Sequence, residues 1–212
     1  MWPAYKQILL LAYALVLKLL SKISLLPILG TARLYGVGTV CAPLIGFFCG
    51  VSSCAFVYCV RTALSFSLGT YGGSFLVHLP TFAGSLVLSS GSRHAPPLIA
   101  ALCIGTFIAH PVGAESFIYT IYWLIPIGIS FLPAPSIFLR SLMSTFITHA
   151  VGSTIFIYTH ETTALFWEML FPQVWFERLT SALILTACYY AVTRTIHLIN
   201  RLGFESNPCQ NR

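Results

Sequence analysis

The sequence predicts an all-α protein, a polytopic membrane helical bundle of about six transmembrane helices with an N-terminal amphipathic helix. Hydrophobic residues make up 57% of the chain and charged residues only 8%, whereas about a quarter of an ordinary soluble domain is charged. Apolar stretches of spanning length follow one another from about residue 36. Backbone groups at that depth in a bilayer must bond internally, so each span is expected to be a helix.

The domain organisation follows from the 212-residue length and the position of the first break. We expect an N-terminal amphipathic or interfacial helix over 1–34, one membrane domain over 35–200, and a cytoplasmic tail over 201–212. Residues 3–29 have a helical pattern, but Lys18 lies near its middle. A central Lys costs about 2.5–3.5 kcal/mol in a span. An interfacial helix is therefore favoured, and a helix whose lysines face protein is the alternative. If residues 8–29 span the membrane, the chain has seven spans and an external N-terminus, which is the minor model.

The membrane domain divides into spans at short polar or Pro/Gly-rich breaks. The segment from His160 to Phe176 is a longer break with two acids and several aromatics, which predicts a short helix lying at the interface. The predicted spans are 37–60, 73–90, 97–113, 116–133, 137–159 and 177–198.

Basic residues predict the orientation. With both termini in the cytoplasm and six spans, nine Lys and Arg residues fall on the inner side, and only Arg61 and Arg178 fall outside. Four of the five glutamates then lie outside, and only Glu205 stays inside. The positive-inside rule favours this arrangement, which predicts an integral protein of the cell (inner) membrane in contact with membrane lipid.

Several functional classes are not expected from the residues. Seven cysteines form no Cys-x-x-Cys pair, which argues against a metal or redox site, and no cofactor is expected. Basic residues are scattered singly, so nucleic acid is not expected as a partner. No Gly-x-Ser-x-Gly, His-Glu-x-x-His or Gly-x-x-x-x-Gly-Lys motif occurs, which argues against an enzyme or a nucleotide site.

The first span carries small residues at four-residue spacing, a pattern that lets helices approach closely. This row predicts either packing within the domain or a docking face for another membrane protein. Its residues are Ala42, Gly46, Gly50 and Cys54.

Polar and aromatic side chains recur at or near membrane depth on separate spans. Pro80 disturbs the second span, and His149 is ionisable in the most polar mid-membrane stretch, which makes it a candidate ligand or proton site. For each residue the alternative is a kink, a packed histidine, an aromatic belt or an interfacial anchor. We expect the adjacent Glu177 and Arg178 to point in different directions. The proposed pocket liners are His78, Thr81, His110, Glu115, Tyr119, Tyr122, Trp123, His149, Ser153, Trp175 and Glu177.

The layout resembles the S component of energy-coupling factor vitamin transporters. Leu79-Pro80-Thr81-Phe82-Ala83-Gly84 is similar to a string in the biotin-specific members, although the glycine run expected after it is missing. The fifth span carries Thr-His-x-x-Gly, and the small-residue row is similar to the family's Ala-x-x-x-Ala contact face. The resemblance implies capture of a small vitamin-like nutrient from outside, with a transmembrane coupling subunit and two cytosolic ATPases as partners.

The sequence therefore predicts an integral membrane protein that binds a small organic nutrient and belongs to a transport system. Energy for uptake would come from partners or an ion gradient. Two rivals remain open. One is a membrane assembly or interaction protein, in which the polar face of the fifth span touches a neighbour. The other is an electron-transfer protein with a haem between His78 and His149.

Overall fold

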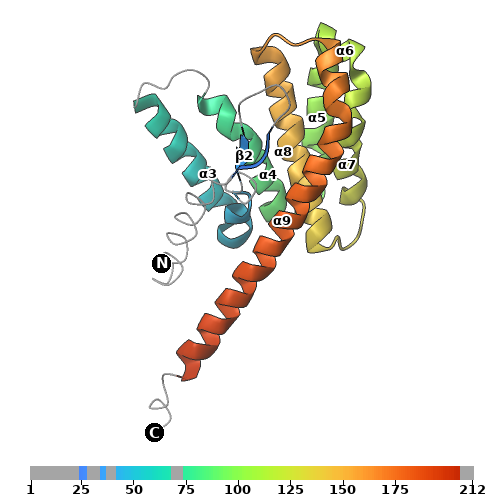
Figure 1. Ribbon diagram of the computed structural model, residues 1–212. Coiled ribbons are helices and arrows are strands. Elements are labelled where there is room, and N and C mark those ends of the chain that lie inside the picture. The colour runs from blue at the N-terminus through green and yellow to red at the C-terminus, as the bar shows by residue number, and fades with distance from the viewer. Residues whose placement is uncertain (1–23, 28–33, 37–41, 68–73, 206–212) are drawn as a thin grey trace.

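A computed structural model describes residues 24–27, 34–36, 42–67 and 74–205, and it is helical apart from one short strand pair (Figure 1). The helical class predicted from the sequence is confirmed. The helical elements are α3 (Leu44–Ser67), α4 (Ser74–Ser90), α5 (Ala95–Ala109), α6 (Pro111–Glu115), the 3-10 helix η1 (Phe117–Trp123), α7 (Leu124–Ser130), α8 (Ile137–Thr159) and α9 (Ala164–Glu205).

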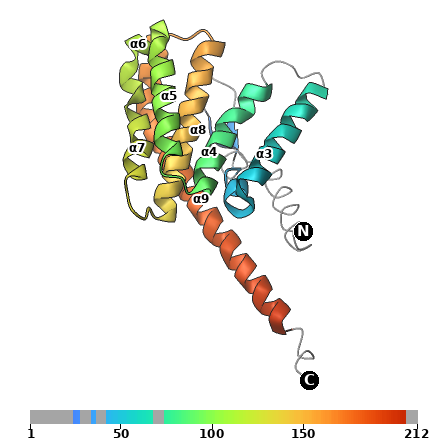
Figure 2. The same ribbon diagram turned by 180° about the vertical axis from the view of Figure 1, so that it is seen from behind.

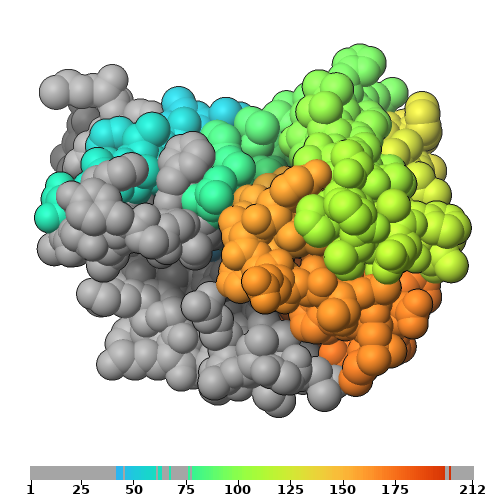
Figure 3. Space-filling view, turned by 90° about the horizontal axis from the view of Figure 1, so that it is seen from above, coloured from blue at the N-terminus to red at the C-terminus, as the bar shows by residue number. Residues whose placement is uncertain are grey.

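The described helices run alternately up and down (Figures 1 and 2). The passes are α3, α4, α5, the combined α6–η1–α7 segment, α8 and α9. The central helix is α8, which packs against α4, α5, α7 and α9, while α3 packs on α4. Figure 3 looks onto one end of the bundle, where the α6 turn lies beside the turn between α8 and α9.

Local sequence explains several helix ends. Helix α5 begins with Pro96 in its first turn, where a missing N–H costs nothing. It ends at His110, directly before Pro111, which starts the next short helix. Helix α8 begins after Ser136, whose hydroxyl accepts a hydrogen bond from the Leu139 N–H. These signals are why α4 and α8 nearly coincide with the predicted ranges 73–90 and 137–159.

Two glycines allow α4 to approach its neighbours closely. A Cβ at Gly84 would collide with the Thr148 side chain of α8, and the Ser144 hydroxyl donates to the Gly84 carbonyl at 2.8 Å. On the other side of α4, a Cβ at Gly46 would stand 2.6 Å from the Ser85 carbonyl oxygen. Helices α3, α4 and α8 therefore form a closely packed layer.

The predicted docking row does not form an open helical face. Ala42 precedes α3, and Gly50 has φ 82° and ψ 170°, so the helix is kinked there and four-residue spacing no longer defines one face. Gly46 and Cys54 are buried, with Gly46 against α4. For these two residues the alternative of packing within the domain is the correct one.

The predicted separation of a short helix within 160–176 from the last span is wrong, because one helix covers both from residue 164 onward. Helix α9 runs unbroken through this segment with Pro172 inside it, and it continues to Glu205. Trp167 and Val174 are buried in the main core, because the aromatics of this segment cover η1 and α8 rather than an interface. At 42 residues α9 is about 63 Å long, and its second half extends beyond the bundle (Figure 2).

The predicted terminal segments fall largely outside the described residues. Residues 1–23 of the N-terminal helix are not described, and Ser24–Pro27 (β1) pairs with Leu34–Gly36 (β2) as antiparallel strands. The predicted helix over 3–29 therefore does not continue through Pro27. At the other end, 201–205 belong to α9 rather than to a tail, and 206–212 lie outside the described residues.

Length and composition single out one helix among the described residues as able to cross a membrane, over Ala164–Leu198. Three further apolar helices are shorter, over Gly46–Val60, Ala95–Ala109 and Phe117–Ser130. A count of six spans is therefore not a result of the structure.

Candidate functional site

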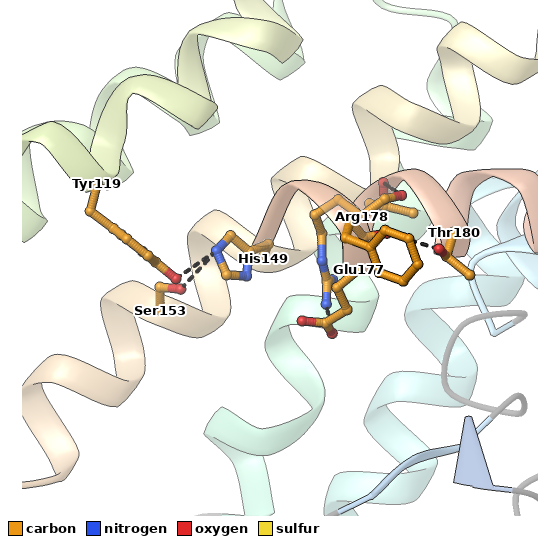
Figure 4. A network of polar contacts seen from close by, with 8 residues as sticks. Tyr119, His149, Ser153, Glu177, Arg178 and Thr180 are labelled. Carbon is orange, nitrogen blue, oxygen red and sulfur yellow. Dashed lines mark hydrogen bonds and ion pairs between the residues drawn. The ribbon is translucent and has the colours of Figure 1, made fainter. Parts of the chain in front are cut away.

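His149 on α8 is the centre of a polar network contributed by two elements (Figure 4). The Tyr119 hydroxyl of η1 lies 2.9 Å from His149 Nε2, and the Ser153 hydroxyl lies 3.4 Å from the same nitrogen. A neutral imidazole with its proton on Nδ1 has one lone pair on Nε2, which accepts from the nearer hydroxyl, that of Tyr119. Tyr119 is 2% exposed, and His149 is partly buried.

An aromatic cluster encloses the Tyr119 side of this network. The Tyr119 ring contacts Phe107 in a stacked arrangement at 5.8 Å and Trp167 edge to face at 4.9 Å. Trp123 contacts both Tyr119 and Phe107 edge to face. These rings fix the position of the Tyr119 hydroxyl, because quadrupole-favoured contacts hold the ring from several sides.

Helix α9 contributes an ion pair that the sequence did not predict. Glu177 and Arg178 were expected to diverge, but the Arg178 guanidinium donates to the Glu177 carboxylate. The Arg178 side chain is 3% exposed, and that of Glu177 is 24% exposed. Burial explains the difference, since a guanidinium removed from water needs a carboxylate close by.

The ion pair lies beside the histidine network. The Thr145 hydroxyl of α8 lies 3.5 Å from the Arg178 carbonyl oxygen, and Thr145 is one helical turn before His149. In Figure 4 the Tyr119 and Ser153 hydroxyls converge on one edge of the His149 ring, and the Glu177–Arg178 pair lies beyond the other edge. We call these five residues the central polar cluster.

Arg178 is the residue that sequence reasoning missed. Starting the last span at 177 placed Arg178 at a membrane edge, whereas α9 begins at Ala164 and Arg178 lies 14 residues into it. A signal was present in the sequence: Trp167, Phe171 and Val174 repeat at helical spacing before Arg178. That pattern would have extended the helix backward and placed the arginine inside the bundle.

Three other predicted liners lie near the cluster in different roles. The Tyr122 hydroxyl donates to the Phe171 carbonyl at 2.6 Å and so ties η1 to α9. Trp123 is fully buried, and its Nε1 has no hydrogen-bond partner among the described residues. Trp175 is 46% exposed and contacts Phe146 at 6.1 Å between ring centroids.

His110 and Glu115 do not belong to the central polar cluster. The His110 ring packs edge to face on Tyr158 at 5.1 Å, at the end of the bundle. Glu115 ends helix α6 and is exposed. That these residues line one pocket with His149 stays a prediction, and Glu115 is not among the residues that contact His149 in the described part of the chain.

His78 and Thr81 line a different place, a small depression between α3 and α4. It is open on one side, and its volume is about 40 Å³. The other lining residues are Ala42, Cys54, Val57, Tyr58, Phe82 and Ser85. These two residues therefore do not lie with the central polar cluster, and the close α4–α8 contact at Gly84 adjoins the depression on the other face of α4.

The separation of His78 from His149 also concerns the alternative of a haem bound between these two histidines. His78 faces the depression shared with α3, whereas His149 Nε2 is occupied by the Tyr119 hydroxyl on the η1 side. The two rings thus face different neighbouring elements rather than one shared space. Among the described residues, no three His, Cys, Asp or Glu side chains gather closely enough to hold a metal ion.

The central polar cluster offers both hydrogen bonding and charge for binding. It presents a guanidinium and a carboxylate, an imidazole, and two hydroxyls, all within an aromatic surrounding. Such a set can orient a polar small molecule while apolar rings contact its body.

No family model, curated protein or solved structure matches the chain.

Proposed function

We propose that this chain is an integral membrane protein that binds a small organic molecule at the central polar cluster and takes part in its transport. In this proposal the six passes cross the inner membrane, with both termini in the cytoplasm. Helices α3 and α8, at 24 and 23 residues, are long enough for a hydrocarbon core of about 30 Å. Helices α4 and α5 are shorter, at 17 and 15 residues, which local bilayer thinning accommodates at modest cost.

The outer surface of the bundle supports the membrane location. Large apolar side chains point outward along α5, η1, α7 and α9, and a soluble monomer rarely exposes so continuous a surface. Lipid tails would cover such side chains without cost. They include Leu98, Leu102, Phe117, Ile118, Ile121, Leu124, Phe131, Leu165, Met169, Phe176 and Leu183, each more than half exposed.

Charge is separated between the two ends of the bundle, as the proposed orientation requires. Arg93 donates to the Pro133 carbonyl at 2.7 Å and Arg140 to the Leu88 carbonyl at 2.7 Å, so both arginines belong to one end. Glu115 and Glu161 lie at the opposite end, in the turns after α5 and α8. The arginine end would face the cytoplasm under the positive-inside rule.

The central polar cluster is the observation that carries the binding proposal. A buried ion pair is not in itself stabilising, because its desolvation offsets its attraction. Ionisable groups within a membrane bundle mark binding or transport sites. His149 and Arg178 come from different helices, and the Thr145 hydroxyl in the middle part of α8 lies 3.5 Å from the Arg178 carbonyl oxygen.

The assembly alternative is less well supported by the contacts of α8. Its hydroxyls bond within the chain: Ser144 to the Gly84 carbonyl, Thr148 to the Ser144 carbonyl and Thr154 to the Ala150 carbonyl. A coupling subunit would also need a contact face other than Gly46 and Cys54, which α4 covers.

Native mass spectrometry of the full chain, released from lipid nanodiscs, tests the proposal. We expect a wild-type peak that carries one additional discrete small-molecule mass. His149→Ala should lose this mass, because removing an orienting hydrogen bond in a dry site costs about 1–3 kcal/mol, or about 5- to 150-fold in affinity.

The control is His160→Ala, because His160 is exposed and stacks on Phe156 outside the cluster. It should keep the bound mass. A wild-type protein that is extracted from membranes by alkaline carbonate, or that carries no small molecule when isolated from its native membranes, would contradict the proposal.

A further inference from the structure

The ion pair at positions 177 and 178 has an unusual construction. Successive residues on a helix project about 100° apart, so neighbouring side chains meet only by bending toward each other. Here the carboxylate that Arg178 contacts comes from the adjacent residue Glu177 rather than from a facing helix. The Glu177 carboxylate can move away from the guanidinium, because its position on the helix does not by itself direct it toward Arg178.

The two partners also differ in burial. The Arg178 side chain is 3% exposed and stays within the core, whereas the Glu177 side chain is 24% exposed. Glu177 can therefore turn toward the surface without crossing packed side chains, and Arg178 cannot. A carboxylate supplied from outside could take the place of Glu177 on the guanidinium with the buried charge still neutralised.

The side chains near Arg178 indicate the chemical character of the rest of such a ligand. Trp175 lies three residues before Arg178, on the same side of α9, and its ring is 46% exposed. His149 lies on the other side of Arg178 with its hydroxyl partners. A flat apolar body joined to the carboxylate would meet the Trp175 ring, and a guanidinium fork suits the two carboxylate oxygens.

We propose that the ligand of the central polar cluster is a small carboxylic acid with a flat apolar body, and that its carboxylate replaces Glu177 on Arg178. This inference rests on the proposed function, and it names the ligand class for the same site. Glu177 serves in the empty protein as an internal substitute for the ligand. Removing the Glu177 charge should therefore strengthen the binding of acids.

The replacement of Glu177 by a ligand carboxylate can be tested with two acids, benzoate and 2-naphthoate. Each acid is compared with its primary amide, and the protein is the full chain in nanodiscs. Isothermal titration should give the acids an affinity at least about tenfold above their amides, as charge-assisted pairing predicts. Glu177→Gln should raise the affinity for acids about fivefold and leave the amides unchanged. The neutral double variant Glu177→Gln with Arg178→Gln should bind acid and amide equally, and it keeps the test valid if the single variant does not fold.

Controls are Glu168→Gln and Arg194→Gln, exposed residues of α9 outside the cluster, which should keep the wild-type preference. Equal affinity of the wild type for acid and amide would overturn the inference, as would unchanged or weaker acid binding by Glu177→Gln in a folded protein. If no probe binds while native mass spectrometry still shows a bound molecule that requires His149, the ligand class is wrong and the proposed function stands. If neither is seen, both fail.

Discussion

Tyr119 and His149 are thirty positions apart in the chain, and their side chains meet at 2.9 Å between the hydroxyl oxygen and Nε2. Tyr119 is buried among aromatic rings, where its hydroxyl lies within hydrogen-bond distance of the imidazole. The contact joins η1 to α8 and sets the orientation of the imidazole. Its loss should therefore affect both stability and ligand binding.

Tyr119→Phe should lower the free energy of unfolding by about 1 kcal/mol, the usual net contribution of one hydrogen bond. The ring contacts remain, so the fold should persist. The measurement is a denaturant titration in mixed micelles. Tyr158→Phe is the matched control, because Tyr158 is half exposed and donates to the Thr106 carbonyl. An equal loss in both variants would contradict a special role for the buried bond.

Gly84→Ala should separate α4 from α8. A Cβ there meets the Thr148 side chain and the Ser144 carbonyl, so the helices must move apart. Overpacking of this kind costs about 1–3 kcal/mol, and unfolding should show it directly. Gly105→Ala on α5 is the control, because a Cβ there meets nothing within 4 Å. That variant should be neutral or more stable by up to about 1 kcal/mol.

Gly46→Leu should destabilise the chain itself rather than release a partner. The Ser85 carbonyl oxygen stands 2.6 Å from the position of an added Cβ, and backbone cannot move aside as a flexible side chain can. The readout is the unfolding transition of the purified chain, with Gly128→Leu as a control in open space. A stable Gly46→Leu protein that has only lost an associated subunit would restore the docking interpretation of the small-residue row.

Protease sites introduced into the turns should report the orientation of the bundle. A site after Ser92 lies beside Arg93 in the exposed turn between α4 and α5, and a site after Glu161 lies in the exposed turn between α8 and α9. In intact cells, external protease should cut only the second site. Cleavage at Ser92 alone would reverse the proposed topology, and cleavage at both would refute the membrane location of the bundle.

The helical class and two helix positions could be predicted because their signals are local. Ser136 and Pro135 mark the start of α8, and Gly91 with its neighbours marks the end of α4. The long α9 could not be predicted from the same signals. Pro172 is typical of a helix start, and Glu168 with the surrounding aromatics is typical of a membrane interface. In the structure the helix is nevertheless continuous, and Trp167 is packed in the core.

Part of the central polar cluster could also be predicted from the sequence. Sequence position identifies polar residues on spans, and it selected Tyr119, His149, Ser153 and Glu177, which do lie in one cluster with Arg178. It does not determine which side of α4 a residue faces. His78 therefore lies on the side of α4 that faces α3, away from His149.

A density map of the full-length chain in a lipid nanodisc would test the central claim most directly. We expect the lipid belt to surround α5, α7 and the first half of α9, with a separate small-molecule density in contact with His149 and Arg178. A belt that leaves these helices in water, or a cluster filled by protein side chains alone in protein isolated from its native membranes, would contradict the account.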